Sequence, residues 1–317
     1  MSSTMRAYVS GAGTPLTLTD QPVPTPGPDD VLVRTRAVAL NNADLTPSGE
    51  DHIVGFEFAG EVVEVGSGVA ADLRGARVMG IAEGAFAEVV VAHHRHVIRL
   101  PEGLSFDAAA TLPTALTTEY GALSLGRMGP ETSVLITAAT SGIGLLGVQI
   151  AKTLGATVVA TTRSPDKSGL LERVGADAVV VTSREGLVAG TKDATGGEGA
   201  SLVLDHVGGD GLADAIEAAR DGGEVISVGR LGGARASIDL FCLARSHVTL
   251  RSVSYGLTPP AVLGDLVDAL APVVLPAVAD GRIRAVVDRA YAFGDAHAAL
   301  ERLASGEAEG KVVLVLD

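Results

Sequence analysis

Residues 134–164, VLITAATSGIGLLGVQIAKTLGATVVATTRS, carry the strongest structural signal in this chain. An apolar segment typical of a buried strand leads through a turn of small residues into a helical stretch and a second apolar strand. The pyrophosphate of a dinucleotide binds at such a turn, because the helix N-terminus offers free N–H groups and a favourable dipole to an anion. The pattern therefore predicts a dinucleotide-binding βαβ unit. The alternative is an ordinary βαβ unit with a glycine-rich turn.

The register of the turn follows from where the first strand ends. A literal G-x-G-x-x-G motif starts at Gly142, but the strand at 133–137 ends too early for that register. We therefore place the tight turn at 138–142 and the small-residue pattern at Ala139-x-Ser141-x-x-Gly144, with Gly147 allowing close helix–strand packing. The residues expected to hold the cofactor here are Ala139, Thr140, Ser141, Gly142, Ile143 and Gly144.

The end of the second strand indicates which dinucleotide binds. An acidic residue about 20 positions after the turn would bind the adenosine ribose 2′-hydroxyl of NADH. This position holds Thr162, followed by Arg163, Ser164 and, further on, Lys167. No carboxylate repels a 2′-phosphate there, and two cations are near enough to bind one. The sequence therefore predicts NADPH as the cofactor.

Composition limits the remaining possibilities. The 317 residues suit two domains, and 47% of them are hydrophobic. The net charge of −14 argues against nucleic acid or an anionic membrane as a partner. The one cysteine, Cys242, excludes an intramolecular disulfide and a multi-cysteine zinc site. We find no run of about 18 apolar residues and no apolar leader, and so expect no membrane span and a cytoplasmic protein.

The pattern of strands and helices changes near residue 105. Residues 1–104 contain short β-like runs separated by turn signals, whereas 105–254 alternate apolar strands with helical stretches. Such alternation predicts a doubly wound parallel sheet. Residues 255–317 contain a helical stretch and two further strands, and we expect them to return and complete the first domain. The strands predicted for the sheet are 133–137, 156–162, 178–181, 201–205, 224–228 and 248–254.

Several motifs together resemble one family. They are VGFEFAGEVVEVGSGV at 54–69, LPEGLSFDAAATLPTALTTEYGAL at 100–123, VLDHVGG at 203–209 and GKVVLVL at 310–316. With the turn, these motifs resemble the medium-chain dehydrogenase/reductase superfamily, in its zinc-free quinone oxidoreductase-like branch. The resemblance implies an α/β Rossmann domain (105–254), a GroES-like β-rich catalytic domain (1–104, completed by 255–317) and a cofactor between them. It also implies hydride transfer from NADPH to a quinone, enone or enoyl substrate.

The resemblance also locates the zinc ligands of zinc-dependent relatives. Aligned by the flanking motifs, these three positions hold Asn41, Phe56 and Thr114. None is a good zinc ligand, because zinc prefers thiolate, imidazole or carboxylate. We therefore expect no metal. Conjugate reduction remains feasible without a Lewis acid, because the developing charge is delocalised as an enolate that hydrogen-bond donors can stabilise.

Five positions outside the turn are implicated by the resemblance. Asn41 lies where the family contacts nicotinamide and substrate, and Asn42 replaces a tyrosine proposed as proton donor in enoyl reductases, leaving an amide that can donate to a carbonyl. Thr118 is expected near the nicotinamide carboxamide, Val207 in the motif that lines the cofactor cleft, and Gly229 where the nicotinamide ring approaches the backbone. The alternative roles are structural: Asn41 and Asn42 would only form a loop, and Gly229 would only end a strand.

The histidines are interpreted as structural. A solvated, extended turn is predicted for His93, His94 and His96, because they follow a strand. The alternation of side chains along an extended segment would point His93 away from the other two. His206 beside Asp205 resembles a catalytic dyad, but adjacent strand residues face opposite sides. No side chain is a convincing general acid, and so we expect a proton from water.

Two further features concern substrate and partners. The segment 45–54 is shorter than the family usually has, which predicts an open cleft for a bulky or carrier-bound substrate. The apolar strand 248–254 would lie at a sheet edge and favours a homodimer. The sequence therefore predicts a zinc-independent NADPH-dependent oxidoreductase acting on a small-molecule quinone or α,β-unsaturated carbonyl. A non-redox enzyme that modifies natural products and a non-catalytic NADPH-binding protein remain as alternatives.

Overall fold

The predicted βαβ unit forms from strand β9 (Ser133–Ile136), helix α3 (Gly142–Thr153) and strand β10 (Thr157–Thr162). The apolar side chains of both strands are buried, as expected for strands covered on two faces. Helix α3 packs on both strands, and Ser141 caps its start by accepting a hydrogen bond from the Gly144 N–H. A buried parallel pair with a crossover helix therefore lies at the centre of this half of the chain.

The structure, a computed structural model, describes residues 4–46, 49–129, 131–255 and 258–317. Contacts divide the chain into two units. The first comprises Met1–Thr114, Pro259–Ala279 and Ala285–Asp317, and the second comprises Ala115–Thr258 and Asp280–Arg284. The sequence pattern places the changes at 104 and 254 instead. It could not show that helix α1 (Phe106–Ala110) packs on strands of the first unit.

The second unit contains the doubly wound sheet. Its six strands are all parallel in the order β11-β10-β9-β12-β13-β14, which confirms the predicted fold class. The order reverses between β9 and β12, and in such sheets a ligand binds outside the carboxyl ends of the strands at this switch point. The remaining strands are β11 (Ala178–Val181), β12 (Ala200–Asp205), β13 (Ala219–Ser227) and β14 (Thr249–Ser252).

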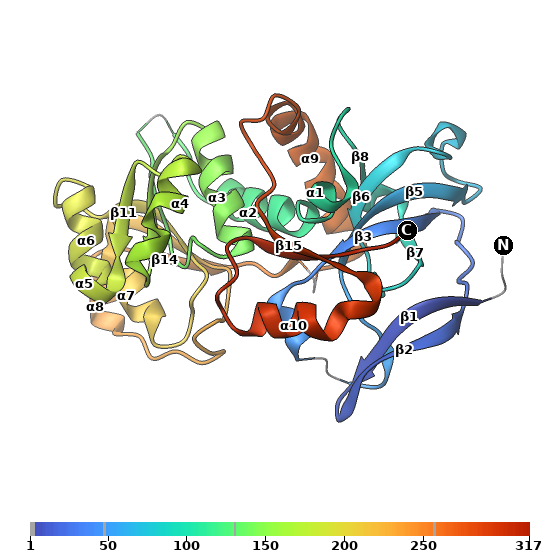
Figure 1. Ribbon diagram of the computed structural model, residues 1–317. Helices are drawn as coiled ribbons and strands as arrows, with labels where there is room; N and C mark the ends of the chain where they lie inside the picture. Colours follow the sequence, from blue (N-terminus) through green and yellow to red (C-terminus); the bar gives the residue numbers. More distant parts are fainter. Residues whose placement is uncertain (1–3, 47–48, 130, 256–257) are drawn as a thin grey trace. The chain divides into compact units, whose positions relative to one another are not determined.

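Helices cover the sheet. In Figure 1, α5 and α6 lie on one side of β11, and α3 lies on the other. Helix α7 packs on β12 and β13, and helix α6 packs on β11 and on α7. The helices are α2 (Pro113–Leu125), α4 (Ser168–Arg173), α5 (Thr182–Glu185), α6 (Leu187–Ala194), α7 (Gly211–Ala218) and α8 (Leu240–Arg245), with the short η4 (Pro165–Lys167) before α4.

The first unit is rich in β-structure. One sheet has the order β2-β1-β4, and a larger one has the order β15-β16-β3-β5-β6-β8, with β7 also paired to β3. Strand β16 runs antiparallel to β3, so the end of the chain becomes part of the sheet that its beginning forms. The strands are β1 (Thr4–Gly11), β2 (Thr14–Pro22), β3 (Asp30–Ala39), β4 (His52–Ile53), β5 (Glu57–Val65), β6 (Arg77–Ile81), β7 (Val89–His93), β8 (Val97–Arg99), β15 (Val287–Ala292) and β16 (Lys311–Val315).

The first unit also contains α9 (Pro260–Ala279), α10 (Ala296–Ala304) and the short helices η1 (Asn42–Leu45), η2 (Ala71–Leu73), η3 (His94–His96) and η6 (Phe293–Asp295). By length and composition alone, α9 could cross a membrane, a test that core helices of soluble proteins also pass. The expectation of no membrane span therefore stays a prediction at α9. Two aspartates interrupt it, Asp265 and Asp268, and both pair with Arg95 at 2.6 Å.

The core of the second unit lies beneath β9, so a large-to-small change there should destabilise the fold. Leu135 on β9 is fully buried, and we expect Leu135→Ala to lower the free energy of unfolding by about 3 kcal/mol through lost burial and a cavity. Leu231→Ala is the control, because 54% of the Leu231 surface is exposed and the change should cost less than about 0.5 kcal/mol. Urea unfolding measures both. Equal losses would contradict the assignment of Leu135 to the core.

Candidate functional site

The turn between β9 and α3 brings backbone segments very close together. Ala138 adopts a left-handed conformation with φ of 47°, which is strained for a residue with a Cβ and is found most often at functional sites. A Cβ on Gly144 would lie 2.7 Å from the Cα of Ala139, so that position requires glycine. The predicted register is compatible with this turn, but the strained residue is Ala138, directly before the pattern.

The start of α3 is suited to an anion. The first N–H groups of a helix have no intrahelical partner. The Ser141 side chain accepts a hydrogen bond from the Gly144 N–H at 3.1 Å, and the Ser141 carbonyl accepts one from the Leu145 N–H at 2.9 Å. Gly142 and Ile143 are the first two residues of α3, so their N–H groups have no acceptor within the helix and are placed to meet an anion. Thr140, Ser141, Gly142 and Ile143 are all partly exposed, whereas Ala139 and Gly144 are buried beneath them.

The end of β10 lies beside this turn, since β9 and β10 are paired. The Thr162 hydroxyl accepts from the Ser164 N–H at 3.1 Å and donates to the Ser164 carbonyl at 3.2 Å, so it shapes the loop. The Arg163 side chain is exposed, and Lys167 is partly exposed at the end of η4. Both cations therefore lie in the segment that follows β10, and their role toward a 2′-phosphate stays a prediction.

The carboxyl end of β12 is held by one aspartate. The Asp205 carboxylate accepts hydrogen bonds from the N–H groups of Val207 and Gly208, both at 3.0 Å, and from the Thr137 hydroxyl at 3.1 Å. Asp205 therefore shapes the turn that contains Val207 and does not form a dyad with His206. A Cβ on Gly229 would lie 2.2 Å from the His206 carbonyl oxygen, so close packing alone already requires glycine there.

His206 pairs with a residue that the sequence reasoning missed. Its Nε2 lies 2.6 Å from the Glu119 Oε1 on α2, and the two side chains are 5% and 0% exposed. Burial lowers the pKa of His206, but the Glu119 carboxylate outweighs it, so the pKa is raised above its ordinary value. The signal in the sequence was a single carboxylate within the apolar helical stretch of α2. Thr118, one residue earlier, is partly exposed on the same helix.

In the first unit, Asn41 belongs to a buried charged cluster. Its amide donates to Glu57 at 3.0 Å and its carbonyl oxygen accepts from the Lys311 ammonium at 2.7 Å. Lys311 also pairs directly with Glu57, and the Thr114 N–H donates to the other Glu57 oxygen at 2.9 Å. Both ends of the Asn41 amide are therefore engaged within the protein. Glu57 and Lys311 lie in motifs quoted above, but their pairing is visible only in the fold.

A cavity of about 720 Å³ lies beside this cluster. Asp44 contributes to its wall and accepts from the Asn41 N–H at 2.7 Å. Burial raises the pKa of the Asp44 carboxyl to about 7; the Asn41 N–H and Lys311 oppose this effect and Glu57 adds to it. Asn42 is exposed at the start of η1, directly before two residues of the lining. The cavity is lined by Ala43, Asp44, Thr46, Glu50, His52, Ile53, Val54, Gly55, Phe56, Glu83 and Gly84.

The three positions that hold zinc in zinc-dependent relatives do not fit the metal here. The Asn41 oxygen accepts from an ammonium, Phe56 has no donor atom, and the Thr114 side chain offers only a hydroxyl. Within residues 4–46, 49–129, 131–255 and 258–317, no group of three or more His, Cys, Asp or Glu residues could hold a metal ion.

The histidines near η3 are arranged differently from the prediction. The His93 ring stacks on His94 with centroids 4.9 Å apart and lies 5.1 Å from His96. The expected extended geometry is wrong, because His94–His96 form a 3₁₀ turn, and the His93 Nδ1 accepts from the Arg95 N–H. His96 also lies 2.8 Å from the Pro260 carbonyl, so the turn packs against α9.

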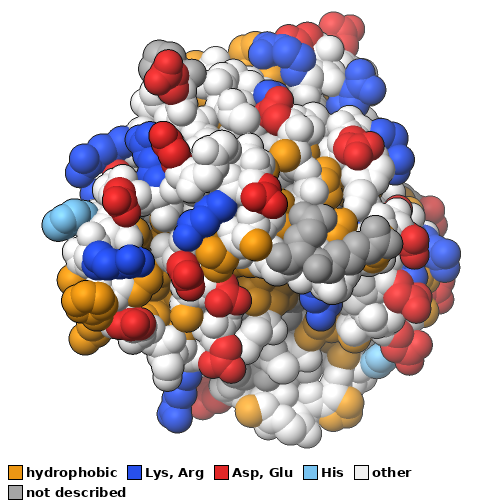
Figure 2. Space-filling model, turned by 90° about the vertical axis from the view of Figure 1, so that its left-hand side faces the viewer, with side chains coloured by type: hydrophobic (Ala, Val, Ile, Leu, Met, Phe, Trp, Pro, Cys, Tyr) orange, Lys and Arg blue, Asp and Glu red, His pale blue; other side chains and the backbone are white. Residues whose placement is uncertain are grey.

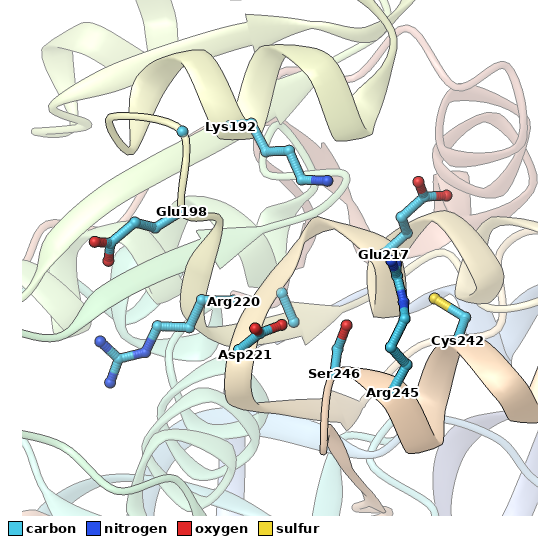
Figure 3. A pocket seen from close by; sticks show the side chains of 10 residues that line it. Lys192, Glu198, Glu217, Arg220, Asp221, Cys242, Arg245 and Ser246 are labelled. Carbon is cyan, nitrogen blue, oxygen red and sulfur yellow. The ribbon is translucent and has the colours of Figure 1, made fainter.

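Another hollow, of about 580 Å³, lies at the opposite, amino end of the parallel sheet. Basic and acidic side chains are mixed in its wall (Figure 3), so it offers no preference for one charge sign. Figure 2 likewise shows Asp and Glu side chains interspersed with Lys and Arg over the face in view. The charged residues of this hollow are Lys192, Glu198, Glu217, Arg220, Asp221 and Arg245.

Two family models match the chain. One, described as alcohol dehydrogenase GroES-like domain, covers residues 27–102, and the other, described as zinc-binding dehydrogenase, covers residues 142–271. A quinone oxidoreductase from Pseudomonas aeruginosa is 30% identical over 308 residues, which are 92% of each protein. Erythronolide synthase from Saccharopolyspora erythraea is 33% identical over 294 residues, 90% of this chain but 8% of that much longer protein.

Solved structures agree with these relatives. The quinone oxidoreductase from Thermus thermophilus, also solved in complex with NADPH, has a TM-score of 0.83 and 30% identity, covering 98% of this chain and 100% of that one. The chain belongs to the medium-chain dehydrogenase/reductase superfamily, in its quinone oxidoreductase-like branch. The resemblance found in the sequence is thereby confirmed.

The raised pKa of Asp44 gives a stability prediction. The folded protein holds this proton up to pH of about 7, whereas an unfolded aspartate loses it near 3.8. Ionisation of Asp44 therefore costs stability increasingly as pH rises from about 4 to about 7. Asp44→Asn, which cannot ionise, should unfold like the wild type at pH 4 and be more stable at pH 8, by up to about 4 kcal/mol.

Chemical denaturation of both proteins at the two pH values measures this difference. Asp221→Asn is the matched control, because Asp221 is exposed and its replacement should give no pH-dependent gain. A difference between Asp44→Asn and wild type that is the same at both pH values would contradict the prediction.

Proposed function

We propose that the chain is a zinc-independent, NADPH-dependent oxidoreductase that reduces a quinone or an α,β-unsaturated carbonyl compound. The observation that supports this most is the strained turn at Ala138, which lies at the switch point of the parallel sheet and precedes the free N–H groups of α3. The names of the relatives in Pseudomonas and Thermus, both quinone oxidoreductases, support the same class of reaction.

The residues of the second unit fit a dinucleotide phosphate. The glycine at 144 lets α3 start close against Ala139, so the partly exposed backbone of 140–143 can meet a pyrophosphate. Arg163 and Lys167 supply positive charge for a 2′-phosphate. Val207 and Gly229 lie at the ends of β12 and β13, the half of the sheet that receives the second nucleotide. Bound NADPH would supply hydride; the protein orients the cofactor and holds its charges.

The residues of the first unit fit a carbonyl substrate. The exposed Asn42 amide can donate a hydrogen bond to a carbonyl oxygen, and Asp44 can hold a proton near neutral pH in the wall of the adjacent cavity. Asn41, held by Glu57 and Lys311, positions the segment that carries both. Without zinc, stabilisation of an enolate oxygen relies on such donors.

A homodimer and a cytoplasmic location are part of the proposal. Strand β14 lies at the edge of the sheet, where its unpaired backbone groups can pair with the same strand of a second copy. Helix α8, directly before it in the chain, exposes 69% of Leu240 and 75% of Phe241. Both features favour a second copy of this chain as the partner over a nucleic acid.

The cofactor assignment predicts a selective loss of affinity. In calorimetric titrations the wild type should bind NADPH much more tightly than NADH. Arg163→Ala or Lys167→Ala should weaken NADPH binding by about ten- to hundredfold, since a hydrogen bond to a charged group contributes roughly 1.5–3 kcal/mol. NADH binding should change little.

Arg220→Ala is the matched control for this experiment. Arg220 is exposed on the same unit but lies at the amino end of β13, away from the predicted cofactor edge. Its replacement should leave both affinities unchanged. Equal affinity of the wild type for NADPH and NADH would contradict the role of Arg163 and Lys167.

The size of the cavity predicts a preference for bulky substrates. The short segment 45–54 borders the cavity of about 720 Å³, although Pro47 and Ser48 within it lie outside the described residues. We expect a polycyclic quinone to be reduced with a kcat/KM at least about tenfold above that of cyclohexenone, because more apolar surface is buried. Loss of NADPH absorbance measures both rates. Faster reduction of cyclohexenone would exclude the open site.

The same assay separates the alternatives. A non-catalytic NADPH-binding protein would bind the cofactor in the titration but show no loss of absorbance with any quinone or enone. A non-redox enzyme on this scaffold would also consume no NADPH, and would instead convert its substrate without a change in oxidation state.

A further inference from the structure

The pair Glu119–His206 is a costly polar arrangement within the second unit. Both side chains are almost fully buried, and they contact each other through one hydrogen bond of 2.6 Å. Among the described residues, the other polar atom of each, Glu119 Oε2 and His206 Nδ1, has no hydrogen-bond partner. A buried pair with unsatisfied atoms stabilises a fold poorly, and apolar residues of similar volume often do as well or better.

The surroundings leave space for this pair. A Cβ on Gly147 of α3 would lie 2.3 Å from the Glu119 Oε2, so the glycine makes room for the carboxylate. The charges that act on His206 are Glu119 from α2 and Asp205 from the end of β12. The other residues that lie next to the pair are Gly147 of α3, Thr137 after β9 and Gly229 after β13. None of these residues has a titratable side chain.

The pair also connects the segments that form the predicted cofactor edge. The His206 N–H donates to the Thr137 hydroxyl at 2.8 Å, directly before the strained turn at Ala138. The His206 carbonyl packs against Gly229, and Val207 follows His206 in the chain. Glu119 thus links α2 to His206, and His206 in turn contacts the segments that follow β9 and β13.

We propose that Glu119 and His206 form a proton-holding anchor for the carboxyl edge of β12, and that NADPH binding at this edge weakens when the pair loses its proton. Glu119 and His206 are positioning residues in this proposal, which rests on the proposed function. With the proton, imidazolium and carboxylate attract each other and hold the edge in place. Without it, the buried carboxylate faces a neutral ring, and the attraction that fixes the edge is lost.

The direction of the pH dependence follows from the charge of His206. The Glu119 carboxylate raises the pKa of His206 above its ordinary value of 6.5 in the folded protein, although burial opposes it. The anchor is therefore complete below pH of about 6.5 and is lost as pH rises through the raised pKa. The 2′-phosphate of NADPH, with a second pKa of about 6, stays charged over this range.

Calorimetric titration with NADPH at several pH values from about 6.5 to about 9 tests the proposal in the full-length protein. The wild-type dissociation constant should rise by about tenfold across this range, within the usual size of coupling between sites. Glu119→Gln keeps a hydrogen-bond acceptor for His206 but removes the charge, and its dissociation constant should change by less than about twofold over the same range. Asp44 titrates in the same range but is present in both proteins, so the difference between the two profiles reports the pair.

Glu224→Gln is the matched control, since Glu224 is also a buried glutamate of this unit but lies on β13 away from His206. Its profile should keep the wild-type slope. If Glu119→Gln does not fold, His206→Gln replaces it, because its amide can donate to Glu119 and cannot titrate; its profile should be equally flat.

Three results would overturn the proposal. A flat wild-type profile would show that no proton is linked to binding. Equal slopes in wild type and Glu119→Gln, with only a lower melting temperature in the variant, would show that the pair merely stabilises the fold; the proposed function would then stand. No NADPH binding by the wild type at any pH would overturn this inference together with the proposed function.

Discussion

The second unit depends on one constraint, the close approach of backbone segments at the carboxyl ends of the parallel strands. Gly144 lies against Ala139, and Gly229 lies against the carbonyl of His206, at distances that exclude any Cβ. These contacts lie beside the point where the strand order reverses between β9 and β12. Backbone segments can therefore approach one another closely here, and the N–H groups at the start of α3 are placed to meet a phosphate.

Both units contain a buried acid paired with a base, but the two pairs differ in how fully they are satisfied. In the first unit, Glu57 accepts from Lys311, Asn41 and the Thr114 N–H, so both of its oxygens have partners. In the second unit, Glu119 accepts only from His206 among the described residues. A satisfied cluster compensates its desolvation through several hydrogen bonds, whereas a single contact leaves much of that cost uncompensated. This contrast is why the first cluster is interpreted as structural and the second as functional.

The fold could be predicted well from the sequence because its signals are local. Apolar runs such as 133–137 and 178–181 must be buried on both faces, and helical stretches between them leave a parallel sheet as the consistent arrangement. The turn at Ala139–Gly144 was also predictable, because small residues between a strand and a helix are typical of a tight turn that brings backbone segments close together. The alternation rule misplaced the ring of His93, because a 3₁₀ turn replaced the extended segment on which the rule depends.

Sequence alone determined the class of fold and the position of the small-residue turn before α3, because each depends on residue types at short spacing. The resemblance to the family located Asn41, Phe56 and Thr114, whose side chains are poor zinc ligands. Tertiary structure decided which charged groups meet. Glu119 and His206 are separated by 87 positions, and Lys311 and Glu57 by 254. No periodicity relates residues so far apart; only the fold, which places Glu119 of α2 against the end of β12 and pairs β16 with β3, brings them together. The roles of these buried charges therefore became visible only in the folded chain.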